Sequence, residues 1–86
     1  MIDINYELYK VFYHVASTLN FSEASKRLFI SQSAVSQSIK TLERKLDQTL
    51  FIRSTKKVQL TPEGEILMRH IEPAMNLIQK GETQLL

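Results

Sequence analysis

The segment ISQSAVSQSIKTLERKL, residues 30–46, decides the fold of this chain. Beyond its first residues, the large apolar side chains recur at intervals of four, three and four, the period of one face of an α-helix. They are Val35, Ile39, Leu42 and Leu46. The other side of the same helix carries hydroxyl and amide groups first, then cations, and no acid. Its members are Ser33, Ser36, Gln37, Lys40 and Arg44. The pattern predicts a helix with one buried face and one acid-free exposed face.

An exposed face of this kind suits the major groove of duplex DNA. Glutamine can both donate to and accept from an adenine edge, and serine can bond to a base or a phosphate. Lysine and arginine further along the helix would meet phosphates as the helix leaves the groove. The alternative is an ordinary solvated helix face, but such faces mix glutamate with lysine. Duplex DNA is therefore the predicted partner.

Charge is segregated along the chain. The formal net charge is only +2, but residues 22–61 carry eight Lys and Arg against three Asp and Glu, which gives +5. The remaining residues carry three cations and six acids, which gives −3. This separation favours a polyanionic partner for the central segment.

Composition argues against several other classes of function. The chain has no cysteine, and its two histidines, His14 and His70, lie in different predicted helices. We therefore expect no disulfide, no metal site and no cofactor. With no Gly-x-Ser-x-Gly turn, and no acid placed to orient either histidine, we expect no enzyme. No apolar run approaches the ~20 residues of a membrane span, and no signal peptide is recognisable, so a cytoplasmic protein is expected.

Two helices are predicted ahead of the central one. The first covers about residues 5–18, and Asn20 is expected to end it in the left-handed conformation. Its apolar face comprises Tyr9, Phe12, Val15, Ala16 and Leu19. Ser22 is expected to cap a short second helix that holds Ala24 and Leu28 inward. The few residues between the second and third helices give the spacing of a helix-turn-helix.

The period changes after Leu46. The stretches LFIRS and KVQLT are predicted to form an antiparallel hairpin with a basic tip. Thr61 followed by Pro62 signals the start of a last helix, in which Pro73 should cause a bend. We divide the chain into a DNA-binding domain, residues 1–61, and a linker or dimerisation helix, residues 62–86. That helix carries an apolar seam, expected to be too extensive for one small domain to cover and to pair antiparallel in a homodimer. The residues expected at the dimer interface are Leu67, Ile71, Ala74, Ile78 and Leu85.

The stretch FSEASKRLFISQSAVSQSIKTLERKLDQTLFIRSTKKVQLTPEG, residues 21–64, resembles the N-terminal DNA-binding domain of LysR-type transcriptional regulators. It is similar to the family's Phe-Thr-x-Ala-Ala, Ser-Gln-Pro-Ala-Val-Ser, Leu-Glu, Leu-Phe-x-Arg and Leu-Thr-x-x-Gly motifs. The resemblance implies a mainly α winged helix-turn-helix of three helices, a two-stranded wing and a long linker helix that pairs two subunits. The expected DNA target is an imperfect inverted repeat. A small-molecule effector is expected only through a further C-terminal domain of a longer regulator.

The resemblance also assigns roles to residues. Those expected to read bases, or to meet the phosphates beside them, are Gln32, Ser33, Ser36 and Gln37. Those expected to hold the DNA backbone are Ser22, Ser38, Lys40, Arg44, Arg53, Lys56 and Lys57. Arg53 is the wing arginine expected next to the minor groove.

Some positions depart from the family pattern. Ser33 replaces a usual proline and Gln37 stands where arginine is frequent, so both bear on which DNA sequence is read. Asp47 replaces a common glycine, and aspartate tolerates the left-handed conformation. Glu43, beside the acid-free exposed face of the third helix, is expected to form a structural ion pair.

The alternative function is a winged-helix module that binds a protein, which would need exposed apolar anchors on the third helix or the wing. The sequence offers none in either place.

Overall fold

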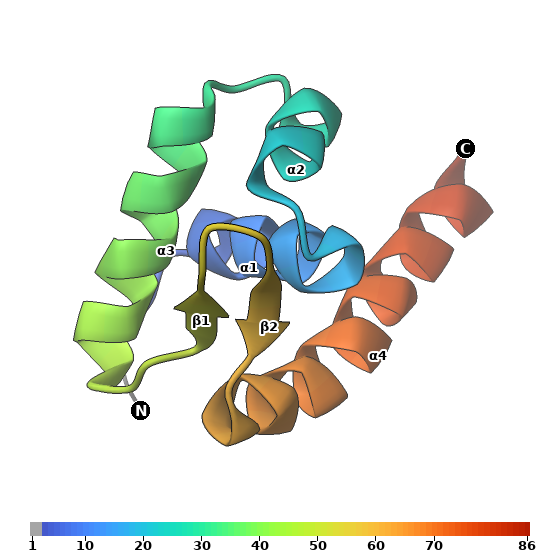
Figure 1. The fold of residues 1–86 in the computed structure, drawn as a ribbon. Coiled ribbons are helices and arrows are strands. Elements are labelled where there is room, and N and C mark those ends of the chain that lie inside the picture. Colours follow the sequence, from blue (N-terminus) through green and yellow to red (C-terminus); the bar gives the residue numbers. More distant parts are fainter. Residues whose placement is uncertain (1–2) are drawn as a thin grey trace.

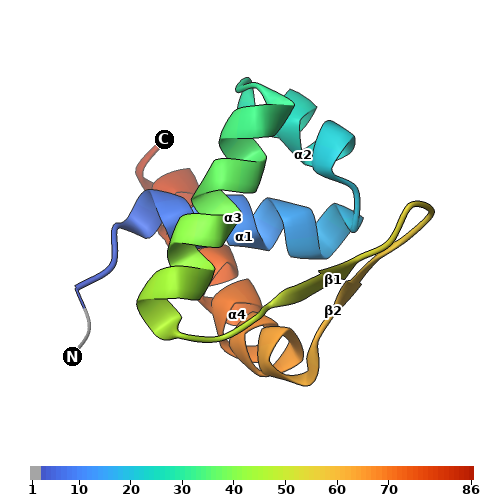
Figure 2. The same cartoon turned by 60° about the vertical axis from the view of Figure 1, so that its left-hand side comes forward.

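The computed structural model describes residues 3–86, which form four helices and one two-stranded antiparallel sheet (Figure 1). The elements in chain order are α1 (Tyr6–Thr18), α2 (Phe21–Leu28), α3 (Gln32–Leu46), β1 (Phe51–Arg53), β2 (Val58–Leu60) and α4 (Pro62–Leu85). The strands pair Phe51 with Leu60 and Arg53 with Val58. Figure 2 shows the β1–β2 hairpin projecting beyond the helices as a wing. The predicted mainly α winged helix-turn-helix is therefore confirmed.

Side-chain caps fix the start of each helix. Ser31 Oγ accepts from the Ala34 N–H at 3.1 Å and begins α3 as predicted. The cap of α2 is Asn20, whose side chain accepts from the Glu23 N–H at 2.9 Å. The prediction that Ser22 caps α2 is therefore wrong, because the Asn20 amide already meets a free N–H at the helix start.

Left-handed residues end the first three helices. They are Leu19 (φ 51°), Phe29 (φ 56°) and Asp47 (φ 53°). Asp47 was expected in this conformation. Leu19 was expected in the apolar face of the first helix, but it lies in the turn and is 42% exposed. Asn20, predicted to be the left-handed residue, is extended (φ −154°) because it caps α2.

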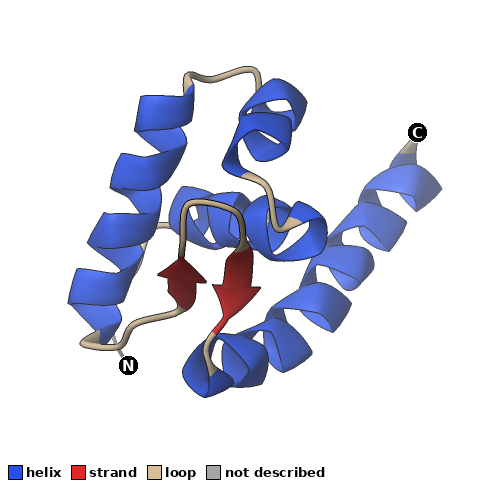
Figure 3. Ribbon diagram, viewed as in Figure 1, coloured by secondary structure: helices blue, strands red, loops and turns tan. Residues whose placement is uncertain are grey.

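The core lies where α1, α2 and α3 meet the base of the wing. Its buried apolar members are Val11, Phe12, Val15, Ala16, Phe21, Ala24, Val35, Ile39, Leu42, Leu50 and Phe51. Figure 3 shows the two short strands between α3 and α4, so the wing joins α3 to α4.

The start of α4 is fastened to the chain just before β1. Thr61, which is 6% exposed, donates its hydroxyl to the Thr49 carbonyl at 2.6 Å and accepts from the Gly64 N–H at 3.0 Å. The Thr61 N–H donates to the Leu50 carbonyl at 3.0 Å. The predicted cap at Thr61 and proline at the first helical position are thus confirmed.

The rest of α4 divides into two parts. Leu67, Met68 and Ile71 are half-buried and pack against the core, whereas most side chains beyond Pro73 are exposed. The helix continues through Pro73, where a bend remains a prediction. No helix within residues 3–86 combines the length and the apolarity that crossing a bilayer demands.

Candidate nucleic-acid interface

The two faces of α3 are oriented as the sequence predicts. Val35, Ile39 and Leu42 are buried, and the opposite row is solvent-accessible. The exposed members of this row are Ser33, Gln37, Lys40 and Arg44. Ser33 Oγ lies 3.1 Å from Ser31 Oγ, at the first turn of the helix. This acid-free row offers neutral hydrogen-bonding groups at the N-terminal end and cations towards the C-terminal end.

One flank of α3 faces the wing. Arg53 Nη1 donates to Ser36 Oγ at 3.3 Å, and Ser36 is half-buried. The Arg53 guanidinium carbon also lies 3.9 Å from the centroid of the Phe21 ring, within the range of a cation–π contact. The wing arginine thus touches both helices of the helix-turn-helix.

Glu43 lies on the same flank and holds the base of the wing. Its Oε2 accepts from the backbone N–H of Leu50 at 2.7 Å and of Phe51 at 3.3 Å. Within residues 3–86 its partners are backbone donors, so the predicted ion pair is wrong. The carboxylate satisfies N–H groups at the point where the chain enters β1, which a sequence pattern does not reveal.

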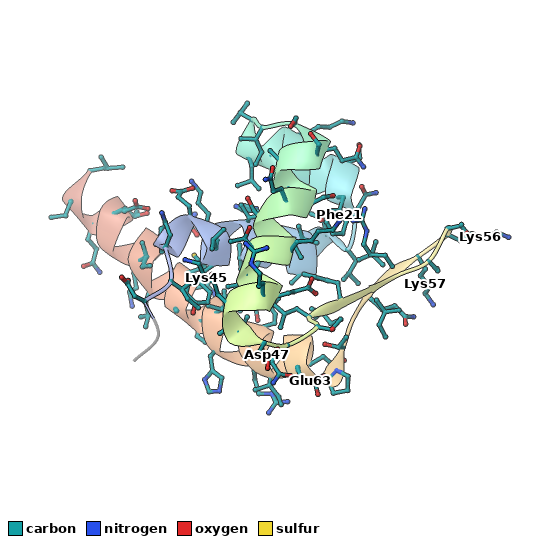
Figure 4. The ribbon with its side chains drawn as sticks, turned by 90° about the vertical axis from the view of Figure 1, so that its left-hand side faces the viewer. Phe21, Lys45, Asp47, Lys56, Lys57 and Glu63 are labelled. Atoms are coloured by element: carbon teal, nitrogen blue, oxygen red, sulfur yellow. The ribbon has the colours of Figure 1, made fainter. Side chains whose placement is uncertain are left out.

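An open groove separates the wing from the first turn of α2. Its volume is about 430 Å³, and its polar lining includes Ser22 of α2, Gln32 of α3, and Arg53, Lys56 and Lys57 of the wing. Figure 4 shows Lys56 at the tip of the wing, pointing away from the helices, and Lys57 just below it. The cations in its lining give the groove the charge to attract a negatively charged backbone.

The predicted site residues therefore fall into two adjacent surfaces. Ser22, Gln32, Arg53, Lys56 and Lys57 line the groove, and Ser33, Gln37, Lys40 and Arg44 form the exposed row of α3. Ser36 lies between the two surfaces. Ser38 is half-buried on the far flank of α3 and belongs to neither surface.

Sequence reasoning missed two exposed apolar residues. Ile52 on the wing is 54% exposed, and Phe29 in the turn before α3 is 93% exposed. The expectation that the wing carries no exposed apolar side chain is therefore wrong. Strand alternation could have revealed Ile52, because Phe51 and Arg53 both face the core side of the hairpin. Single exposed apolar residues are common on proteins, so neither one indicates a docking surface.

Comparison with known proteins gives a consistent result. The family model described as "Bacterial regulatory helix-turn-helix protein, lysR family" matches residues 6–65. The chain is 43% identical over 74 residues to the HTH-type transcriptional regulator PerR of Escherichia coli, covering 86% of this chain and 25% of PerR. It is 38% identical over 79 residues to the regulator HdfR of Yersinia enterocolitica, covering 92% of this chain and 27% of HdfR. The chain thus spans about a quarter of the length of these relatives.

Solved structures share the arrangement of elements. The crystal structure of the CbnR DBD–DNA complex superposes with a TM-score of 0.82 at 26% identity, covering 94% of this chain and 93% of that one. The oxidized form of OxyR from Corynebacterium glutamicum superposes with a TM-score of 0.87 at 29% identity, covering 95% of this chain and 26% of that one. Because the family model covers most of the chain and the relatives agree with it, the chain belongs to the LysR family of bacterial regulatory helix-turn-helix proteins.

Proposed function

We propose that this chain is the sequence-specific DNA-binding domain of a transcription regulator. The observation that carries the proposal is the acid-free exposed row of α3, placed beside a groove lined by wing cations. The DNA complex of a related domain with the same fold supports it. The N-terminal half of α3 would enter the major groove, and the wing would lie on the backbone and the adjacent minor groove.

Within this proposal, neutral and charged side chains do different work. Gln32, Ser33 and Gln37 would meet base edges, because they lie at the slender N-terminal end of α3. Phosphates would be held by residues of the groove and of the later turns of α3. The phosphate-binding group comprises Ser22, Lys40, Arg44, Arg53, Lys56 and Lys57.

The test is duplex binding by fluorescence anisotropy at several salt concentrations. If each of two subunits neutralises about four to six phosphates, the log–log slope of affinity against salt should be roughly −7 to −11. Lys56→Gln should weaken binding to all duplexes and reduce the slope by about one per subunit. Lys80→Gln, the same change at an exposed position late in α4, is the control. A slope near zero, or equal behaviour of the two variants, would contradict the proposal.

Base reading needs a separate measurement. Gln37→Ala should cost about 1–3 kcal/mol on the preferred duplex and relax selection at one base pair. Selection of sites from random duplexes, with wild type and variant in parallel, measures both effects. An unchanged selected sequence would remove Gln37 from the base-reading group.

We also propose that two copies pair through α4. Ile66, Leu77 and Leu85 are 51%, 68% and 90% exposed, and Ile66 borders an open apolar groove of about 500 Å³ that Leu46 and Leu50 help to line. In an antiparallel pair, the second half of one α4 would cover this groove on the other copy. The predicted interface residues Ala74, Ile78 and Leu85 fit such a pair, since all three are exposed.

Ile71 is expected to contribute less to this pair than the sequence suggests. Leu67 and Ile71 are both half-buried against the core of their own chain, but Leu67 also lines the apolar groove that the partner helix would cover. The outer stripe through Ile66 and Leu77 would join Leu67 in the pair. The two recognition helices would then reach two half-sites of an imperfect inverted repeat.

Sedimentation equilibrium tests the pairing. Leu77→Asp should raise the dimer dissociation constant at least about tenfold, because it places a charge in an apolar contact. Asn76→Asp adds the same charge at the neighbouring exposed position and is the control. A wild-type protein that stays monomeric at tens of micromolar, with and without DNA, would exclude the dimer. The effector response expected from the resemblance stays a prediction.

A further inference from the structure

Arg53 is held in place before any ligand binds. Its guanidinium lies 3.9 Å from the centre of the Phe21 ring and donates to Ser36 Oγ at 3.3 Å. A planar guanidinium stacked on a ring loses much of its rotamer freedom, which a lysine in the same place would keep. The side chain thus spans three elements: the wing, α2 and α3.

The ring beneath Arg53 is itself fixed by the core. Phe21 is 4% exposed and meets the Phe51 ring edge-on, with centroids 6.2 Å apart. Phe51 in turn contacts Phe12, with centroids 5.4 Å apart. Because Phe51 and Arg53 point to the same side of β1, one strand sets both the aromatic contact and the guanidinium contact. Figure 4 shows Phe21 in the angle between α3 and the wing.

We propose that Phe21, Arg53 and Ser36 form a latch that sets the position of the wing relative to the recognition helix. The latch serves the DNA binding proposed above and therefore rests on it. Phe21 and Ser36 are positioning residues: they act through Arg53 and touch no DNA. The guanidinium has five N–H groups and, within residues 3–86, gives one to Ser36, so the others can meet a phosphate at the edge of the groove.

The latch changes the role of Ser36. From the family resemblance, Ser36 was expected among the base-reading residues. Its hydroxyl instead accepts from Arg53 at the edge of the row through Ser33 and Gln37 that faces the wing. Ser36 therefore fixes the distance between wing and α3 and leaves base selection to its neighbours.

The first experiment needs no DNA. Amide hydrogen exchange is measured at the hairpin, where the Ser54 N–H donates to the Lys57 carbonyl at 2.9 Å. Phe21→Leu keeps apolar bulk but removes the ring face, and Arg53→Lys keeps the charge but removes the planar group. Both should speed exchange of the hairpin amides about two- to fivefold, as expected for loss of a cation–π contact at an exposed site. Lys56→Gln, at the wing tip, should leave exchange unchanged.

Arg53→Lys separates the loss of the latch from a folding defect, because it leaves the core intact, whereas Phe21→Leu changes a core residue. Unchanged hairpin exchange in this variant would overturn the latch. So would equal acceleration by Lys56→Gln, which would mean that any charge loss on the wing loosens it. These results do not depend on whether the protein binds DNA.

The second experiment uses duplexes. Ser36→Ala should weaken binding to all duplexes by the same factor of about two to five and leave the selected sequence unchanged. A changed preference at one base pair would show that Ser36 reads a base and would overturn its role in the latch. If wild type binds no duplex, the proposed function fails, whereas the exchange data still decide whether the latch exists.

Discussion

The two halves of α4 both mix apolar and charged residues, but they lie in very different surroundings. Residues 62–71 are fastened to the body: Thr61 caps the helix and bonds to Thr49, Gly64 is buried, and Ile71 packs on the core. Among the described residues, those from 72 to 85 lie beside α1 on one flank, where Tyr6 Oη donates to Met75 Sδ at 3.4 Å. One helix thus contains a segment that completes the domain and a segment whose outer side chains are exposed.

The two glycines of α4 mark this contrast. A Cβ on Gly64 would overlap the Leu50 carbonyl oxygen and lie 2.9 Å from Leu60 Cδ2, whereas one on Gly81 would meet nothing within 4 Å. Glycine is required at Gly64 because two backbones approach closely there. At Gly81 it only lowers the intrinsic stability of the helix. The same residue type therefore has opposite effects in the two halves.

The largest effect is expected from Gly64→Ala. The added methyl must displace the backbone at Leu50, and we expect the free energy of unfolding to fall by about 2–4 kcal/mol. Urea unfolding followed by circular dichroism, at one protein concentration because of the proposed dimer, measures the change. A loss below about 1 kcal/mol would mean that the close approach at Leu50 relaxes easily.

Thr61→Val should have the next largest effect. It keeps the shape of the side chain but removes the hydroxyl that meets both Thr49 and Gly64, so a buried N–H and a carbonyl lose their partner. The expected loss is about 1–3 kcal/mol in the same unfolding experiment. Thr61→Ser retains the hydroxyl and should lose clearly less. Equal losses for the two variants would mean that the hydroxyl of Thr61 contributes no more to stability than its methyl group.

Gly81→Ala should act in the opposite direction. Alanine is a better helix former and finds open space, so we expect the free energy of unfolding to rise by about 0.5–1 kcal/mol. Thermal unfolding at fixed concentration gives the sign. A destabilisation would show that the second half of α4 already has a close neighbour at Gly81, as a tightly packed partner helix would provide.

The family motifs show how much the sequence could predict. Within Leu-Thr-x-x-Gly, Thr61 followed by Pro62 indicated a helix start, because capping by Thr61 is a local event between residues three apart. The sequence did not reveal that Thr61 and Gly64 also contact Thr49 and Leu50. Similarly, Leu-Phe-x-Arg pointed to a wing arginine, but its contact with Phe21 joins residues far apart in the chain. Local periodicity predicts elements, whereas these contacts depend on the tertiary fold.

The turns were predicted less well for the same reason. Leu19 and Phe29 occupy left-handed positions that glycine or asparagine usually takes, and no local preference of leucine or phenylalanine favours that conformation. The surrounding helices impose it. Likewise, Glu43 is an acid near cations in the sequence, which favoured an ion pair, but the fold brings free backbone N–H groups to its carboxylate instead.

The smallest effect concerns the loosely covered flank of the second half. A cavity of about 240 Å³ lies between α1 and α4, lined by Lys10, Tyr13 and His14 on one side and Met75 and Glu82 on the other. Within residues 3–86, His14 Nδ1 is buried there without a hydrogen-bond partner. Burial lowers the pKa of His14 below 6.5, and the charges of Arg27 and Lys10 lower it further.

This shift gives stability a pH dependence of known sign. The pKa of His14 is lower in the folded chain than in the unfolded chain. As the pH falls below about 6.5, the unfolded chain therefore binds more protons than the folded chain, and the free energy of unfolding decreases. His14→Gln removes the titrating group and should flatten unfolding free energies measured from about pH 5 to 7. His70→Gln leaves His14 in place and should keep the slope. If His14→Gln keeps the wild-type slope, a group other than His14 causes it. Protonation of His14 in the cavity beside the second half of α4 would then have no effect on the free energy of unfolding.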